Sequence, residues 1–322
     1  MKGSRRPLPA PVALMPATIR APRSALVLAA LLLSLALPAV PASAQIDFGL
    51  SDDEERALRI GIKAGQTIYS LAKAMDHLTP EDQFYLGRAT AAHILATYPL
   101  YEDPEALRYV NLIGQSLVLA STRPEVYDGY RFAVLDSEEI NAFACPGALV
   151  FITRGMLRLT RTEDELAAVL AHEIAHIQSQ HGRQVIEEKR WKKFWAVAGT
   201  GAVVGMGNKV VSQLAFTLGS MSDDLFVALH TKGYGKKLEK EADPQAVEML
   251  QRTGYDPHAL VRVLEGLAER REEDGKKGFL RTHPKPQGRL EELGKLRKAE
   301  PRPVPAARQE RFHQALGSAR AP

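Results

Sequence analysis

Two histidines and a glutamate in the segment His172-Glu173-Ile174-Ala175-His176 have the residue types and spacing of a hydrolytic metal site. Positions i and i+4 of an α-helix share a face, so the imidazoles of His172 and His176 can bind one tetrahedral metal ion. Glu173 lies at the edge of that face, where its carboxylate can take a proton from a water molecule that the metal activates. The pattern predicts a zinc-dependent hydrolase with Glu173 as the general base.

The HExxH pattern also occurs by chance, and the alternative is a helix surface with two solvated histidines. The flanking residues argue against this alternative because they are apolar on several sides of the predicted helix: Leu166, Val169, Leu170, Ala171, Ile174 and Ala175. Burying two unpaired histidines and a carboxylate is costly, so a buried HExxH helix favours a metal site.

His181, nine residues after His172, is a candidate for the third ligand. On a continuing helix it would be rotated about 140° from His176, because each residue turns the helix by about 100°. We therefore interpret His181 as a surface or capping histidine.

The segment 239–243 offers a better third ligand. Glu239 and Asp243 lie four residues apart on a predicted helix and share a face, whereas Glu241 points about 200° away from Glu239. We predict that Glu239 binds the metal and that Asp243 orients a ligating imidazole by accepting its hydrogen bond. The alternative is a solvated acidic stretch, since lysines alternate with these acids.

The elements that must position these residues are mostly helices. Two short segments rich in β-forming residues, 130–135 and 148–153, predict strands of a small sheet. The spacing of apolar residues and the capping signals predict helices over 51–75, 81–98, 103–121, 163–190, 236–252, 256–271 and 286–299. The expected fold class is α+β, predominantly helical, with a small β-sheet next to the HExxH helix. The glycine-bearing apolar segment 195–219 is either a packed helical hairpin or a mobile flap.

These motifs together resemble the zinc peptidase family that includes HtpX, BepA, LoiP and the CAAX prenyl endopeptidases. The HExxH segment is followed by Glu-Lys-Glu-Ala-Asp at 239–243. Further matches are Ile-Asn-Ala-Phe-Ala-Cys-Pro-Gly at 140–147 with the strand after it, Gly233-Tyr234, and Thr282-His283-Pro284 with Arg289. They cover about residues 50–297 in the family's order and are most similar to the BepA-like branch, without its helical repeat array.

The resemblance implies a zincin-like metallopeptidase domain with one Zn²⁺ per chain. The implied metal ligands are His172, His176 and Glu239, with Glu173 as the base and Asp243 beside them. His283 would lie near the metal, either as a displaceable extra ligand that masks the site or as a donor to the oxyanion. Arg289 would hold or polarise the same region.

The resemblance also implies where the substrate binds. The strand that contains Ala148, Leu149, Val150 and Phe151 would pair with extended substrate backbone. Strand addition gives main-chain affinity with weak side-chain preference, which suits an unfolded polypeptide.

Residues 1–44 have the layout of a secretory signal peptide. Basic residues precede an apolar run at 25–40, and Ala42-Ser43-Ala44 is a small-x-small cleavage signal. The alternative, an uncleaved anchor, is disfavoured because the run is short for a bilayer span. This leader holds five of the 42 Lys and Arg residues and none of the 38 Asp and Glu residues. The rest of the chain is therefore nearly neutral, and the basic pI does not indicate nucleic-acid binding.

The expected organisation is a signal peptide at 1–44, a zinc metallopeptidase domain at 45–299 and a largely disordered tail rich in Pro, Ala and Arg at 300–322. With a single cysteine, Cys145, no intrachain disulfide can form. The expected function is a periplasmic endopeptidase, without a membrane span in the mature chain, that hydrolyses unfolded or misassembled envelope proteins. The outer-membrane assembly machinery is an expected partner. The alternatives are a latent protease that acts mainly as a chaperone or assembly factor, and a metal-independent interaction protein.

Overall fold

The HExxH segment lies on a helix that is buried along nearly its whole length. The computed structural model describes residues 52, 78–198, 225–227, 233–274, 278–283, 286–297 and 300–320. Helix α6 (Glu163–Gln178) is buried from residue 163 to residue 177 and begins at Thr162, whose side chain accepts a hydrogen bond from the backbone N–H of Glu165. An apolar helix with a capped, acidic first turn is stable in this central position because both its side chains and its free N–H groups find partners.

A three-stranded sheet packs beside α6 in the order β1-β3-β2. Strand β1 (Arg131–Leu135) runs parallel to β3 (Leu149–Thr153), and β2 (Ala142–Cys145) runs antiparallel to β3. Side chains alternate between the faces of a sheet. One face, which includes Val150 and Ile152, joins the main core with α6, whereas Phe143 and Phe151 of the other face join a second cluster with helix α3.

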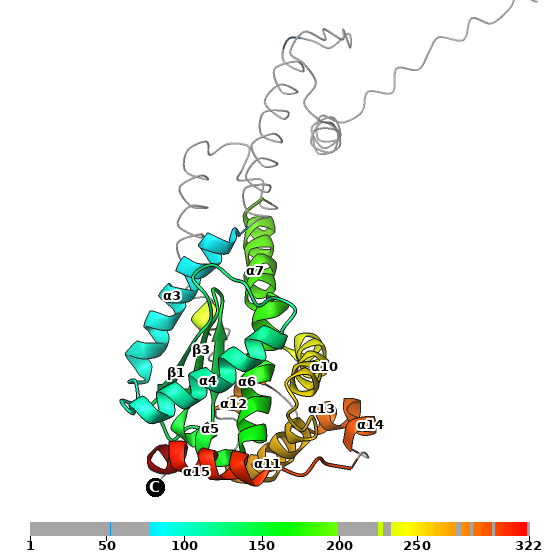
Figure 1. Ribbon diagram of the computed structural model, residues 1–322. Helices are drawn as coiled ribbons and strands as arrows, with labels where there is room; N and C mark the ends of the chain where they lie inside the picture. The colour runs from blue at the N-terminus through cyan, green and yellow to red at the C-terminus, as the bar shows by residue number, and fades with distance from the viewer. Residues whose placement is uncertain are drawn as a thin grey trace, which may run out of the picture. The chain divides into compact units, whose positions relative to one another are not determined.

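The remaining helices surround α6 and the sheet (Figure 1). Helix α3 (Pro80–Thr97) starts with a capping box between Thr79 and Asp82, and α4 (Pro104–Ala120) starts at the capping residue Asp103. The other helices are α5 (Arg154–Leu159), α7 (His181–Ala198), α10 (Lys236–Arg252), α11 (Ala259–Asp274), α12 (Phe279–Thr282), α13 (Pro286–Glu292), α14 (Gly294–Arg297) and α15 (Ala306–Arg320). Helices α10 and α11 pack on α6. The α+β, predominantly helical fold class is confirmed.

The predicted continuous helix over 163–190 is wrong at one point. Gln180 has a positive φ of 55°, which ends α6 and lets α7 start at His181. The side chain of Gln245 on α10 holds this break by bonding to Gln178 and Ser179. Because the chain turns here, the helical rotation predicted for His181 does not apply.

The predicted disorder of residues 300–322 is also wrong, because α15 covers Ala306–Arg320. Phe312 and Leu316 of α15 are fully buried in the main core. The Arg311 guanidinium forms an ion pair with the buried Glu163 at the start of α6. The composition of the tail favours disorder, but two buried apolar side chains and ion pairs to the buried carboxylates of Glu163 and Asp164 fix this helix on the domain.

Several predictions concern segments outside the described residues: the signal peptide at 1–44, the helix at 51–75 apart from residue 52, and most of segment 195–219. Among the helices that the structure describes, none is both long and apolar enough to cross a membrane.

Candidate metal centre

Helix α6 brings the two histidines of the HExxH segment together. The Nε2 atoms of His172 and His176 are 3.1 Å apart, and their rings are perpendicular. Both side chains are almost completely buried. Their spacing of one helical turn therefore places two potential metal ligands side by side, as the sequence predicts.

Glu239 of α10 reaches the same point from the neighbouring helix. Its Oε2 atom is 3.4 Å from His172 Nε2, and its Oε1 atom is 3.4 Å from His176 Nε2. Glu241, two residues further along the same helix, is 44% exposed, whereas Glu239 is buried. The predicted phase of α10 is therefore the one that the structure shows.

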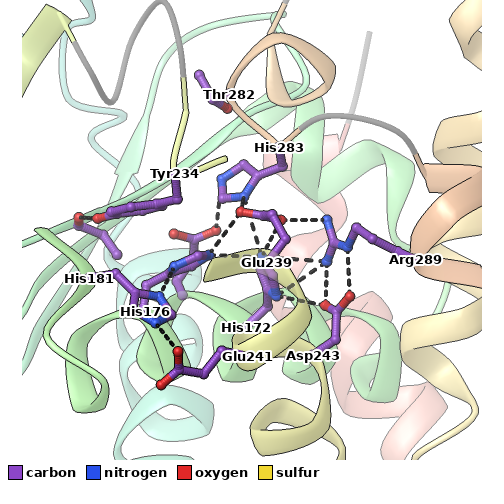
Figure 2. A network of polar contacts seen from close by, with 12 residues as sticks. His172, His176, His181, Tyr234, Glu239, Glu241, Asp243, Thr282, His283 and Arg289 are labelled. Carbon is purple, nitrogen blue, oxygen red and sulfur yellow. Dashed lines mark hydrogen bonds and ion pairs between the residues drawn. The ribbon is translucent and has the colours of Figure 1, made fainter. Parts of the chain in front are cut away.

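His283, at the end of α12, adds a fourth donor atom (Figure 2). Its Nδ1 atom lies 3.3 Å from His172 Nε2 and 2.9 Å from Glu239 Oε1. The four side chains of this metal cluster, His172, His176, Glu239 and His283, offer ligand atoms that all lie within 4.8 Å of one another. The His283 ring also stacks on the Phe279 ring, with ring centres 4.1 Å apart, and this contact fixes the orientation of the imidazole.

The donor set fits a zinc ion. Zinc–nitrogen and zinc–oxygen bonds of 2.0–2.1 Å in a tetrahedron separate two ligand atoms by about 3.3–3.4 Å. The observed separations of 2.9–3.4 Å are close to this value. In addition, Oε2 of Glu239 is buried and accepts no hydrogen bond from the described residues, although it forms an ion pair with Arg289 at 3.1 Å. A bound cation would add to the compensation of this buried carboxylate.

Asp243 and Arg289 support the cluster from the side of His172. Asp243 Oδ1 lies 3.1 Å from His172 Nδ1, and the Arg289 guanidinium binds both carboxylate oxygens of Asp243 at 2.6 and 2.8 Å. Arg289 Nη1 also lies 3.1 Å from Glu239 Oε2. Burial opposes ionisation of Asp243, but Arg289 and the hydrogen bond from His172 outweigh it and hold the pKa of this carboxyl below its usual range. Asp243 therefore stays ionised and fixes the His172 ring.

The same groups stabilise positive charge at the cluster. Burial and the charge of Arg289 lower the pKa of His172, but the hydrogen bonds to Asp243 and Glu239 outweigh them and raise this pKa to about 9. Burial opposes ionisation of Glu239 as well, yet His283 and Arg289 hold its pKa well below the usual range. Carboxylates that favour a protonated imidazole here also favour a metal cation at the same point.

Glu173 lies beside the cluster with both carboxylate oxygens free. Neither oxygen has a hydrogen-bond partner among the described residues, and the side chain is completely buried. Its Oε1 atom is 3.6 Å from His283 Nε2. Burial raises the pKa of Glu173. A desolvated carboxylate next to a metal site has the properties of a general base.

Three residues in contact with the cluster were not assigned a role from the sequence. His181 is fully buried with its Nδ1 atom 2.7 Å from His176 Nδ1, so its prediction as a surface histidine is wrong. Tyr234 stacks on the His176 ring at 4.1 Å, and Phe279 stacks on His283. In the sequence, the family match at Gly233-Tyr234 and the short spacing between His176 and His181 indicate that Tyr234 and His181 lie close to the cluster.

The predicted substrate strand requires a correction. Ala148 lies outside β3 and has a positive φ of 66°, and β3 is the central strand, paired on both sides. A strand with no free edge cannot add a substrate strand. The free edge nearest the site belongs to β2. The N–H group of Thr153 donates to the carbonyl oxygen of Asn141, and hydrogen-bonded and non-hydrogen-bonded pairs alternate along two antiparallel strands. The backbone groups of Ala142 and Ala144 therefore point away from β3, toward the free edge. The Tyr234 hydroxyl donates to the carbonyl oxygen of Ala144 at 2.8 Å.

A small pocket lies next to His176 and Tyr234. Its walls come from the β2–β3 turn, the start of α3, the segment before β1 and the break between α6 and α7. The pocket therefore lies between the end of β2 and the His176 side of the metal cluster.

An HExxH helix, a glutamate from a later helix and a free carboxylate beside them define a zinc metallopeptidase. The model of peptidase family M48 matches residues 104–297. The chain belongs to peptidase family M48 and has the donor set of a zinc metallopeptidase.

Named relatives agree with this assignment. The chain is 31% identical to the beta-barrel assembly-enhancing protease of Yersinia pestis over 81% of its length and 28% identical to that of Escherichia coli (strain K12) over 76%. It is also 30% identical to the mitochondrial metalloendopeptidase OMA1 of Schizosaccharomyces pombe over 58% of its length. The matched regions cover 51%, 48% and 51% of these relatives, so the chain spans about half of their length.

Proposed function

We propose that this protein hydrolyses internal peptide bonds of unfolded or misassembled envelope proteins, with His172, His176 and Glu239 as the zinc ligands. The observation that carries the proposal is the group of four buried donor atoms within 4.8 Å of one another, beside the Glu173 carboxylate, which accepts no hydrogen bond from the described residues. No group of this kind is needed by a metal-independent interaction protein, because buried and unpaired carboxylates lower stability.

A bound zinc ion would supply Lewis acidity that acidifies a water molecule and polarises the scissile carbonyl. Glu173 would take the proton of that water molecule and return it to the leaving amine, because its oxygens are the free acceptors at the cluster. Asp243 and Arg289 would keep the His172 ring in place during these steps.

The substrate backbone would pair with the outer edge of β2. The Ala144 carbonyl faces this edge, and the Tyr234 hydroxyl that occupies it would be replaced by a substrate N–H group. The neighbouring pocket next to His176 and Tyr234 would face a substrate side chain that extends from this edge. Since this mode of binding uses hydrogen bonds to the substrate main chain, an extended or unfolded polypeptide segment is the substrate class that fits the β2 edge.

The cellular role follows from the relatives and the N-terminal sequence. Two relatives are named beta-barrel assembly-enhancing proteases, and residues 1–44 have the pattern of an export signal. We infer a periplasmic enzyme that acts during outer-membrane protein assembly, with the assembly machinery as its partner.

Glu173→Gln tests the enzymatic part of this proposal. The variant keeps the zinc ligands and the volume of the side chain but loses the base. We expect full zinc content by metal analysis and no detectable cleavage of casein. Cleavage at the wild-type rate would exclude Glu173 as the base, and wild-type protein without zinc would exclude the metal site itself.

A latent form of the enzyme is supported by the position of His283. Its Nδ1 atom lies 3.3 Å from His172 Nε2 and 2.9 Å from Glu239 Oε1, where it would compete with a water molecule or substrate for the metal. In this conformation, the protein would bind polypeptides as a chaperone or assembly factor without cleaving them.

His283→Ala separates masking from catalysis. If His283 masks the metal, the variant cleaves casein several-fold faster than the wild type and keeps its zinc. If His283 instead donates to the oxyanion, cleavage falls by about 10²–10³-fold at unchanged zinc content.

A further inference from the structure

The outer nitrogen of each ligating histidine has a different partner. His172 Nδ1 faces the Asp243 carboxylate at 3.1 Å, whereas His176 Nδ1 faces the Nδ1 atom of His181 at 2.7 Å. His176 and His181 are both buried, and their ring centres are 4.9 Å apart. The His181 side chain is thus in direct contact with the second HExxH histidine, on the side away from the metal cluster (Figure 2).

We propose that His181 is a positioning residue for the metal ligand His176. The inference rests on the proposed function, since it assumes that His176 binds zinc through Nε2. It concerns a residue outside the ligand set.

If His176 binds the metal through Nε2, this determines which ring nitrogens of His176 and His181 carry a proton. When Nε2 of His176 gives its lone pair to a metal ion, the remaining proton of the neutral ring is on Nδ1, which becomes a donor. His181 Nδ1 at 2.7 Å must then be the acceptor. The proton of His181 is therefore on Nε2, which has no hydrogen-bond partner among the described residues and lies 3.6 Å from Glu241 Oε2. The tautomer of His181 thus follows from that of His176.

Local structure holds His181 in the required place. The positive φ of Gln180 turns the backbone so that α7 starts at His181 itself. Tyr234 covers both rings, stacked on His176 at 4.1 Å and 5.9 Å from the ring centre of His181. The next residue, Gly182, packs closely on Pro146 of the β2–β3 turn. The orientation of His181 is thus set by three separate parts of the chain.

Without His181, the Nδ1–H group of His176 would lose the only acceptor that contacts it in the described part of the chain. A buried donor without an acceptor disfavours the tautomer that leaves Nε2 free for the metal. Removing this kind of partner typically lowers metal affinity by about 10–100-fold.

The test compares His181→Leu with His181→Asn in the full chain. Leucine fills a similar volume without an acceptor, whereas the asparagine carbonyl oxygen lies near the position of Nδ1 and can accept from His176. Zinc affinity is measured by competition with a chromophoric chelator, and the geometry is followed by the absorption spectrum of the Co²⁺-substituted protein. His313→Ala, an exposed change on α15, is the control.

We expect about 10–100-fold weaker zinc binding and a shifted Co²⁺ spectrum for His181→Leu, with most of the affinity restored in His181→Asn. Zinc affinity of His181→Leu equal to that of the wild type would overturn the inference. Equal losses in both variants, together with equal losses of thermal stability in the metal-free proteins, would also overturn it, because they would indicate a packing role only.

Different results would contradict the proposed function and the positioning role of His181. Wild-type protein that binds zinc but cleaves no polypeptide contradicts the proposed function and leaves the positioning role intact. Wild-type protein that cleaves casein while His181→Leu keeps full zinc affinity contradicts the positioning role alone.

Discussion

Acidic residues of α10 differ in their contacts with the metal cluster according to the face of the helix on which they lie. Glu239 and Asp243 are buried on the face toward α6, whereas the side chain of Glu241 is 44% exposed. Asp243 is held by Arg289, so the His172 ring is fixed by a charged pair that does not bind the metal itself. An acidic run of five residues thus contains the proposed ligand Glu239, the proposed orienting group Asp243 and a half-exposed acid.

Substitutions of Glu239 and Glu241 on α10 test the different roles of these two residues. Glu239→Ala removes a ligand, so we expect the purified variant to lose its zinc. Glu241→Ala keeps all ligands, and its carboxylate touches His181 only at 3.6 Å, so we expect the zinc to be retained. Metal analysis of both proteins provides the measurement. The opposite result would mean that the two glutamates exchange places on the helix.

At the scale of elements, α15 is part of the domain. Phe312 is completely buried against the core that includes α6. Arg308 and Arg311 of α15 pair with Asp164 and Glu163 in the first turn of the HExxH helix. The helix that carries the metal ligands is therefore held at its N-terminus by the last helix of the chain.

Phe312→Ala should lower the free energy of unfolding by about 3–5 kcal/mol, because it leaves a cavity at a fully buried aromatic position. Urea denaturation followed by circular dichroism measures this change. His313→Ala, next to it on the exposed face, should have an effect below about 0.5 kcal/mol. Equal effects of the two changes would contradict the packing of α15.

Acid pH should weaken the attachment of α15 through Glu163. Burial raises the pKa of this carboxyl, but hydrogen bonds from Arg311 and Tyr109 outweigh burial and lower the pKa below its usual value. A lowered folded-state pKa gives stability above the unfolded value of about 4.3, and this stability is lost as the pH falls toward the folded value. Unfolding free energies measured from pH 7 to pH 3 should therefore fall less steeply in Glu163→Gln than in the wild type.

At the scale of the whole molecule, the metal cluster joins three segments that are far apart in the sequence. His172 and His176 come from α6, Glu239 from α10 and His283 from the end of α12. Gly233, with a positive φ of 65°, packs directly on the backbone of Thr282, so the segments before α10 and at α12 also touch. A bound ion would hold these segments together.

Removal of zinc should therefore destabilise the entire domain. Ligand binding to the folded state alone adds roughly 4 kcal/mol when the free ligand is at a thousand times its Kd. We expect the melting temperature to fall on treatment with a chelator and to recover when zinc is added back. Glu239→Ala should show little response to either treatment. An unchanged melting temperature of the wild type would mean that the ion does not link these segments.

The sequence by itself determined the candidate ligands on each helix, because the spacing of residues along a regular helix decides which side chains share a face. This reasoning placed His172 and His176 together, separated Glu239 from Glu241, and predicted α3, α4, α10 and α11 within a few residues of their bounds. The α+β class followed from two short β-rich segments among amphipathic helices.

Only the tertiary structure decided the contacts made where regular structure ends. One residue with a positive φ, Gln180, turns His181 back onto His176, and neither local spacing nor composition reports such a turn. The central place of β3 and the attachment of α15 depend on pairing and burial between distant segments. Helical periodicity is a local property of the chain, whereas sheet order and core packing are set by partners far away in the sequence.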